Sequence, residues 1–234
     1  MTRILCFPPA GAGASFFGQW RTSVLTGCTL VPVDLPGKEK RYAEEPHRRV
    51  STLVGQLVPE LHRKIGDGDR VALFGHSFGA VLAYEVAAAL AEGTCREVLL
   101  FVSGSPGPAT RRQVRVTGRD DEAFLDGVRR FAGYWHPALD DPELRELLLP
   151  GLRADVEMHE TYEPEVSRVL SLPVVAIRGT DDALVSAEAA AEWSAVTSGS
   201  FRLEEVPGGH MYLVDRWPAV IRIIESALAE RASS

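Results

Sequence analysis

Short apolar runs alternate with amphipathic segments along the chain, and this alternation predicts a parallel β-sheet covered by helices. The first five apolar runs are nearly continuous, as in strands that are buried on both faces. The sixth run alternates apolar and polar positions and carries Glu204 and Glu205, which indicates an edge strand. The six predicted strands are residues 4–7, 30–33, 71–74, 98–102, 174–177 and 201–206.

Helical periodicity fills most of the intervals between these strands. Apolar residues recur at helical spacing after Ser51, which we expect to be the N-cap of the first helix. The segment that follows the third strand is rich in alanine, the best helix former. The predicted helices are residues 51–65, 78–90, 187–196 and 218–231.

One interval is much longer than the others. About seventy residues separate the fourth strand from the fifth, whereas a strand–helix connection normally takes only a few residues. This interval shows helical patterns at 121–131 and 142–161 and no clear strand. We therefore expect a single domain over residues 1–234, with a helical lid inserted at roughly 108–171.

Composition and charge narrow the class of protein. The chain has 234 residues, 45% of them hydrophobic, which suits a soluble globular protein. Its net charge of -7 and the lack of a long basic run argue against nucleic-acid binding, in which phosphates must be neutralised. No apolar run reaches the ~18 residues of a membrane span, and the run near the N-terminus is too short for a signal peptide. We expect a cytoplasmic protein that does not bind membranes.

The three cysteines give no sign of a metal site or a disulfide framework. Cys6, Cys28 and Cys95 are odd in number and widely spaced, and no pair has metal-ligand spacing. This usage fits a reducing compartment.

A serine stands where a nucleophile is expected. Ser77 lies in the pentapeptide Gly-His-Ser-Phe-Gly at residues 75–79, directly between a predicted strand and a predicted helix. This context matches the sharp turn that presents a nucleophilic serine above a sheet. His76 is adjacent in sequence but should point away on so tight a turn, so we expect it to pack or hydrogen-bond.

A base and an acid follow in the order that α/β-hydrolases use. His210 comes after the last strand, in the glycine-rich sequence 207–210, and is the expected general base. Asp181 and Asp182 both follow the preceding strand, and the spacing from Gly179 and Val185 favours Asp182 as the acid. The order of serine, acid and histidine, together with the parallel sheet, predicts an α/β-hydrolase fold.

Two backbone amides are candidates for an oxyanion hole. One is the N–H of Phe78, the residue after the nucleophile. The other is the N–H of Ala10, the first free donor after the first strand, because two prolines precede it. The same loop contains Gly11 and Gly13, but position 16 is phenylalanine, so the dinucleotide-binding pattern is incomplete.

Several motifs together resemble the type II thioesterases of polyketide and nonribosomal peptide pathways, over nearly the whole chain. Lys38 departs slightly from the family, which more often has arginine at that position. The motifs are Phe7-Pro8-Pro9-Ala10-Gly11 with Phe16, Phe17 and Trp20; Asp34-Leu35-Pro36-Gly37; the pentapeptide and Ala80; Phe124-Leu125; Leu147-Leu148-Leu149-Pro150; Arg153-Ala154-Asp155; and Gly208-Gly209-His210-Met211-Tyr212-Leu213.

The resemblance implies an activity, partners and site residues. Enzymes of this family remove stalled or misprimed acyl groups from the phosphopantetheine arm of acyl or peptidyl carrier proteins. They need no metal or organic cofactor, and we expect a monomer here. Ser77, Asp182 and His210 would form the catalytic triad, with Ala10 and Phe78 as oxyanion donors.

Two further groups of residues are candidates from the inserted segment. Aromatic and apolar side chains there would line a substrate channel, and a run of arginines would dock the acidic carrier protein. The channel candidates are Tyr134, Trp135, His136 and Met158; the docking candidates are Arg111, Arg112 and Arg115, with Arg119 nearby.

Three other readings remain open at this stage. A fatty-acyl chain-releasing thioesterase or a small-ester carboxylesterase would use the same triad. A non-catalytic binding module of the same fold would typically lack one triad residue, and here all three are present.

Overall fold

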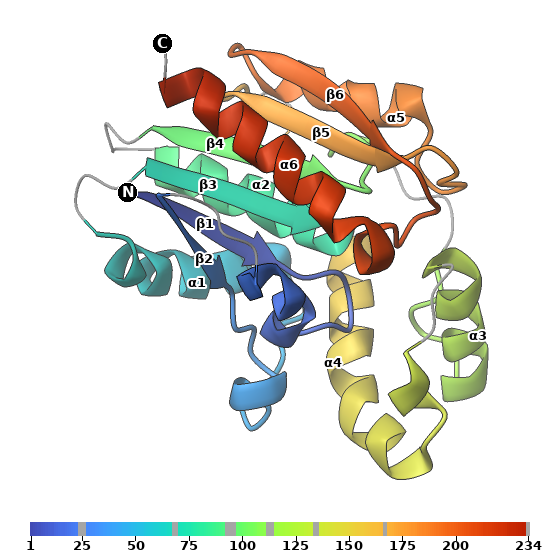
Figure 1. Cartoon of the computed structure of the whole chain (residues 1–234). Helices are drawn as coiled ribbons and strands as arrows, with labels where there is room; N and C mark the ends of the chain where they lie inside the picture. Colours follow the sequence, from blue (N-terminus) through green and yellow to red (C-terminus); the bar gives the residue numbers. More distant parts are fainter. Residues whose placement is uncertain are drawn as a thin grey trace.

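The computed structural model describes residues 1–22, 27–66, 70–91, 97–110, 115–132, 136–165 and 168–232. In these ranges, six strands form one sheet in the order β2-β1-β3-β4-β5-β6, and every neighbouring pair is parallel. The predicted α/β architecture is therefore confirmed (Figure 1). The strands are β1 (Thr2–Phe7), β2 (Cys28–Pro32), β3 (Arg70–His76), β4 (Val98–Ser103), β5 (Val174–Gly179) and β6 (Phe201–Val206).

One edge of the sheet agrees with the prediction from the apolar pattern and the other does not. β6 is an edge strand, as its alternating pattern predicts. β2 is the other edge, and all five of its residues are half-buried. The prediction that this strand is buried on both faces is wrong: among the described strands β2 pairs only with β1, and at this edge its residues are only half-buried.

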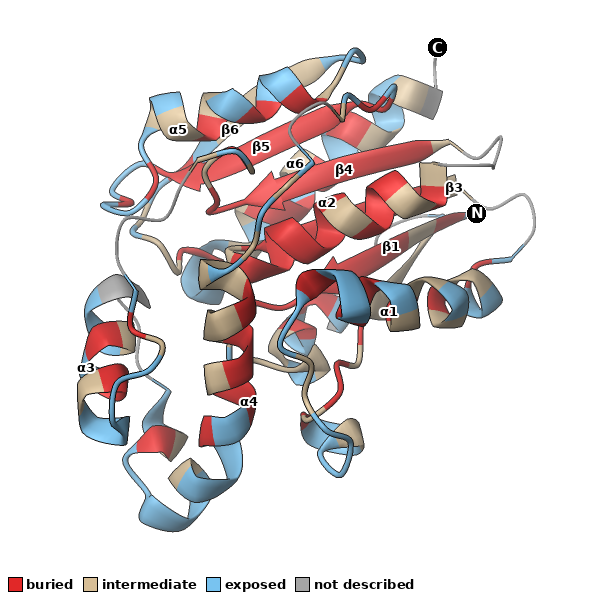
Figure 2. Cartoon of the chain, turned by 180° about the vertical axis from the view of Figure 1, so that it is seen from behind, coloured by how far each residue is buried: buried red, intermediate tan, exposed pale blue. Residues whose placement is uncertain are grey.

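Helices cover both faces of the sheet. α1 (Val50–Lys64) and α2 (Phe78–Ala91) lie on one face and α6 (Leu213–Ala232) on the other, as the two opposite views show (Figures 1 and 2). The first face carries a cluster that includes Phe78 and Trp193. The second face carries a cluster in which Trp20 packs with residues of α6. The remaining short helices are η1 (Ala14–Phe17), η2 (Gln19–Thr22), η3 (Glu39–Arg41), α5 (Ala187–Ala191) and η5 (Glu192–Val196).

Three helix boundaries differ from those predicted. α1 begins at Val50, so Ser51 lies inside the helix and is not its N-cap. The segment 187–196 is not one helix, because it tightens from α5 into the 3₁₀ helix η5 at Glu192. α6 begins at Leu213 and not at Pro218, since a proline within a helix removes one backbone hydrogen bond but does not prevent packing from holding the helix together.

The long segment between β4 and β5, for which we predicted an insertion at roughly 108–171, has helices where helical patterns were predicted. It contains α3 (Asp121–Ala132), η4 (Pro137–Leu139) and α4 (Pro142–Glu160), and its described residues include no strand. A small apolar cluster of its own holds these helices together, with Phe124 fully buried and Leu152 nearly so. α4 rises from this cluster and contacts α2 beside the sheet (Figure 1).

Among the described residues, no helix is both long enough and apolar enough to cross a lipid bilayer.

The contribution of a central strand to stability can be measured by removing one of its buried side chains. Phe101 on β4 is fully buried, so Phe101→Ala should lower the free energy of unfolding by about 3–5 kcal/mol, through lost burial and the cavity left behind. Leu147→Ala is the control, because that leucine is 60% exposed and its loss should change stability by less than about 0.5 kcal/mol. Urea unfolding of both variants tests this, and equal effects would contradict it.

Candidate active site

Ser77 stands on a strained turn at the end of β3. Its φ of 53° lies in the left-handed region that non-glycine residues rarely adopt. β3 ends at His76 and α2 begins at Phe78, so the strand-to-helix turn is a single residue. The Ser77 N–H donates to the Ser103 carbonyl at 2.8 Å, which ties the turn to β4.

The two glycines of the pentapeptide are required by close backbone contacts. A Cβ at Gly75 would lie 2.0 Å from the Gly79 carbonyl oxygen. A Cβ at Gly79 would lie 2.2 Å from the Phe7 carbonyl oxygen. Backbone from β3, α2 and the end of β1 therefore meets without intervening side chains.

The structure brings Ser77, His210 and Asp182 into one chain of hydrogen bonds. His210 Nε2 lies 3.2 Å from Ser77 Oγ, and His210 Nδ1 lies 2.9 Å from Asp182 Oδ2. The loops that carry the histidine and the acid are pressed together, since a Cβ at Gly179 would lie 2.3 Å from the Gly208 carbonyl oxygen. The three side chains come from three loops at the carboxyl edge of the sheet, where ligands bind in open α/β sheets.

Asp182, and not the adjacent Asp181, faces the histidine. Its Oδ1 accepts hydrogen bonds from the N–H groups of Leu184 at 2.8 Å and Val185 at 3.2 Å. Burial acts to raise the pKa of Asp182, but the bonds from His210 and from these amides outweigh it, so the pKa is lowered. Asp181 is exposed. The carboxylate beside His210 is therefore held ionised.

A second histidine, His76, lies beside His210 and has different surroundings. His76 is fully buried, its ring is 5.3 Å from that of His210, and its Nδ1 lies 2.9 Å from Ser103 Oγ. The Ser103 hydroxyl is hydrogen-bonded to the Tyr212 hydroxyl, which in turn donates to the Ile177 carbonyl at 3.1 Å. Burial, helped by the nearby His210, lowers the pKa of His76 to about 3. His76 is thus neutral and hydrogen-bonded, as the sequence led us to expect.

The two predicted oxyanion donors belong to segments that meet near the serine. Phe78 is the first residue of α2, and the first N–H groups of a helix have no partner within it. Ala10 is half-buried in the loop after β1, and within the described residues its N–H donates to no protein acceptor. The contacts of Gly79 with the Phe7 and Pro8 carbonyls hold this loop against the turn at Ser77.

The candidates from the insertion fall in different places. Met158 is buried in the same apolar cluster as Phe78. His136 is exposed, and its Nδ1 accepts the Ala138 N–H at 3.2 Å, so it caps η4. Arg115 and Arg119 are exposed. Tyr134, Trp135, Arg111 and Arg112 lie outside the described residues.

Two features of the site were missed from the sequence. The His159 ring lies edge-on to the Phe78 ring at 5.4 Å, so α4 reaches the residue after the nucleophile. Asp155 is buried and accepts the Gly11 N–H at 2.7 Å. A signal for Asp155 does exist, because it follows Leu152 at helical spacing and so falls on the apolar face of α4.

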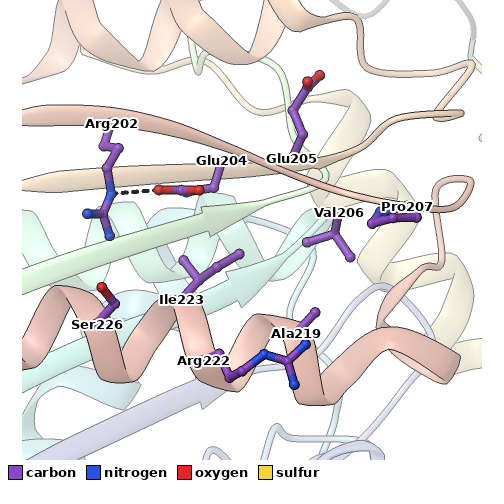
Figure 3. A pocket seen from close by; sticks show the side chains of 9 residues that line it. All are labelled: Arg202, Glu204, Glu205, Val206, Pro207, Ala219, Arg222, Ile223 and Ser226. Atoms are coloured by element: carbon purple, nitrogen blue, oxygen red, sulfur yellow. Dashed lines mark ion pairs between the residues drawn. The ribbon is translucent and has the colours of Figure 1, made fainter.

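The described residues offer no candidate metal centre. Among the described residues, no group of three or more His, Cys, Asp or Glu side chains could hold a metal ion. A shallow cavity of about 300 Å³ lies elsewhere, between β6 and α6, where Arg202 pairs with Glu204 at 2.8 Å (Figure 3). None of the three hydrogen-bonded side chains lines it.

This arrangement suits acyl transfer through a covalent intermediate. A serine activated by a histidine attacks a carbonyl carbon, and two N–H donors can hold the oxygen that becomes negative. The buried carboxylate keeps the imidazole oriented and stabilises its protonated form.

Three known proteins of similar sequence or fold are described as thioesterases. A family model described as a thioesterase domain matches residues 2–228. The thioesterase PikA5 of Streptomyces venezuelae is 36% identical over 227 residues, which cover 97% of this chain and 80% of that protein. The type II thioesterase BorB, from the borrelidin biosynthetic cluster, is 33% identical with a TM-score of 0.86, covering 96% of this chain and 91% of that one. RedJ, from the prodiginine pathway of Streptomyces coelicolor, is 32% identical with a TM-score of 0.86, covering 96% and 85%.

The two adjacent aspartates provide a matched test of the hydrogen-bond chain. Asp182→Asn should lower kcat on an activated thioester by about 10³- to 10⁴-fold, because the amide stabilises the wrong histidine tautomer. Asp181→Asn removes the same charge from the neighbouring residue, whose side chain is exposed, and should leave kcat unchanged. Equal losses in steady-state kinetics would contradict the assignment of Asp182.

His76 should make stability depend on pH in a defined window. The pKa of His76 is 6.5 in an ordinary environment and about 3 in the fold, so between these pH values the unfolded chain binds a proton that the folded chain does not bind. The stability that comes from a neutral His76 is therefore fully present above pH 6.5 and is lost as the pH falls toward 3. From pH 7 to pH 5, the wild type should lose about 2 kcal/mol more unfolding free energy than His76→Asn, whose amide can keep the bond to Ser103. Urea unfolding at both pH values checks this, and equal losses would show that His76 does not titrate.

Proposed function

The chain belongs to the thioesterase family, and we propose that it is an editing enzyme of the type II group, which releases stalled or aberrant acyl chains from carrier proteins of polyketide or nonribosomal peptide synthesis. The observation that carries the proposal is the chain of hydrogen bonds from Asp182 through His210 to Ser77, in a sequence that a thioesterase model matches over residues 2–228. BorB and RedJ, each linked by name to a biosynthetic cluster or pathway, support the same class of substrate.

Acylation is the first half of the proposed reaction. Ser77 Oγ attacks the thioester carbonyl carbon while His210 Nε2 takes the hydroxyl proton. The carbonyl oxygen becomes negative and faces the N–H groups of Ala10 and Phe78. The carbon–sulfur bond then breaks, the sulfur takes the proton from His210, and the acyl group remains as an ester on Ser77.

Hydrolysis is the second half and reuses the same groups. His210 Nε2 removes a proton from water, whose oxygen attacks the acyl carbon. The bond to Ser77 Oγ breaks, the serine regains its proton from His210, and the free acid leaves. Every step uses only water and groups of this chain, so the proposed cycle needs no cofactor.

The proposal also covers the partner protein and the path of the acyl group. The acyl group would arrive on the phosphopantetheine arm of an acyl or peptidyl carrier protein. Met158 would border its path, because it packs in the same cluster as Phe78. Arg115 would take part in docking, because it is exposed and an acidic carrier surface attracts a cation.

A matched panel of substrates tests this function. The same acyl groups are presented on a carrier protein, on free pantetheine and as oxygen esters, and kcat/KM is measured for each. We expect kcat/KM to be at least about tenfold higher on the carrier than on pantetheine, since contacts remote from the reacting bond lower the barrier. Ser77→Ala should reduce turnover to about one thousandth of the wild-type rate or less.

The other outcomes identify the rival functions. Equal kcat/KM on carrier and pantetheine would indicate a thioesterase that does not recognise the carrier. A preference for oxygen esters would indicate a carboxylesterase. Absence of turnover, together with absence of Ser77 labelling by a fluorophosphonate, would indicate a binding module.

A further inference from the structure

A buried ion pair joins the insertion to the loop that carries Ala10. Asp155 lies on α4, and Lys38 lies in the loop between β2 and η3. The Lys38 ammonium contacts Asp155 Oδ2, and the two side chains are 7% and 3% exposed. The same Oδ2 accepts the Gly11 N–H at 2.7 Å. One carboxylate oxygen therefore links three segments that are far apart in the sequence.

The bond to Gly11 constrains the orientation of the neighbouring amide. Gly11 has a φ of 79°, and a Cβ there would lie 2.7 Å from the Leu152 side chain, so this position suits only glycine. Ala10 precedes it, and its N–H is a proposed oxyanion donor. Because a peptide unit is planar, fixing the Gly11 N–H fixes the whole Ala10–Gly11 peptide and limits how the Ala10 backbone can rotate.

The segment after β2 contacts the segment after β1 at a second point, where Glu39 of η3 meets Ser15 of η1. Glu39 has a φ of 45°, a left-handed conformation that costs energy for a non-glycine residue. In this conformation its carboxylate accepts the Ser15 N–H at 3.1 Å and the Ser15 hydroxyl. Lys38 and Glu39 thus hold the segment after β1 from adjacent positions, Lys38 through Asp155 at Gly11 and Glu39 directly at Ser15.

Stability alone is a poor reason for such a pair. A buried ion pair loses hydration that its attraction only partly restores, and apolar residues of similar volume often serve stability as well. Burial raises the pKa of the Asp155 carboxyl, while Lys38 and the Gly11 N–H act against that rise. A charged acceptor at this point is better explained by the position it imposes on the loop.

We infer that Lys38 and Asp155 are positioning residues of the oxyanion site, which hold the Ala10 N–H toward the developing oxyanion and couple that position to helix α4 of the insertion. The inference rests on the proposed thioesterase function. It assigns to α4 a part in the chemical step, separate from any part in covering the acyl chain.

The test separates the chemical step from substrate binding. Asp155→Asn keeps the shape of the side chain but loses its charge, and Lys38→Met keeps the length but loses the ammonium. Each variant should lower kcat by about 10- to 100-fold, as expected when an oxyanion donor is misplaced, while KM stays within about threefold. Lys38→Arg retains the charge and should keep kcat within about threefold of the wild type.

A second readout reports on the oxyanion itself. A trifluoromethyl ketone analogue of the acyl chain forms an adduct with Ser77 that carries the oxyanion. Its inhibition constant should rise by the factor by which kcat/KM falls, whereas binding of the free acid should not change. A purely structural role would not produce this parallel.

The control is another ion pair of the same helix. Arg153 lies on α4 two residues before Asp155 and pairs with Asp121 at 2.6 Å, within the insertion. Arg153→Met should leave kcat and the inhibition constant unchanged. Thermal unfolding of all variants, with active sites counted by fluorophosphonate labelling, corrects for misfolded protein.

Several outcomes would overturn the inference. Wild-type kcat in Asp155→Asn and Lys38→Met, even with lower unfolding temperatures, would leave the pair a structural role only. A rise in KM at constant kcat would assign it to substrate binding. Failure of both variants to fold would make it a determinant of folding. Failure of the proposed function looks different, because the wild type itself would then not turn over.

Discussion

The site depends on a close approach of three backbone segments at positions where glycine leaves out the Cβ atom. The end of β1, the turn at Ser77 and the first turn of α2 meet at Gly75 and Gly79, where an added methyl group would lie 2.0 and 2.2 Å from carbonyl oxygens. This contact allows a serine with a φ of 53° to stand at the start of a helix. The same contact brings the loop after β1 close to the first turn of α2, so one packing constraint positions both the proposed nucleophile and the segments of the proposed oxyanion donors.

Local sequence patterns were enough to predict the strands and the residues that follow directly after them. Ser77, Asp182 and His210 each follow a predicted strand, and parallel strands place the residues after them along one edge of the sheet. The spacing from Gly179 and Val185 also favoured Asp182 over Asp181, and Asp182 is the aspartate that is hydrogen-bonded to His210. What these signals could not predict is set by neighbours in space, such as the half-buried state of β2 at the sheet edge.

The contacts of the insertion show the same limit more sharply. Asp155 falls on the apolar face of an amphipathic helix, which marks it as unusual, but its partner Lys38 is 117 residues away in the sequence. No spacing rule connects the two, because their contact exists only once α4 packs against the loops after β1 and β2. The insertion is thus a separate helical unit in the sequence pattern but part of the site in three dimensions.

Two buried groups close to His210 end in different charge states, although burial disfavours the charged form of both. Asp182 stays ionised because His210 and two amides stabilise its charge, while burial and the nearby His210 keep His76 neutral with a pKa of about 3. An imidazolium on His210 therefore meets a negative charge on one side and an uncharged, hydrogen-bonded layer on the other. If His76 carried a proton, the two like charges would oppose proton uptake by His210 from Ser77. In the proposed mechanism, a neutral His76, hydrogen-bonded to Ser103, therefore favours proton uptake by His210, as the facing carboxylate does.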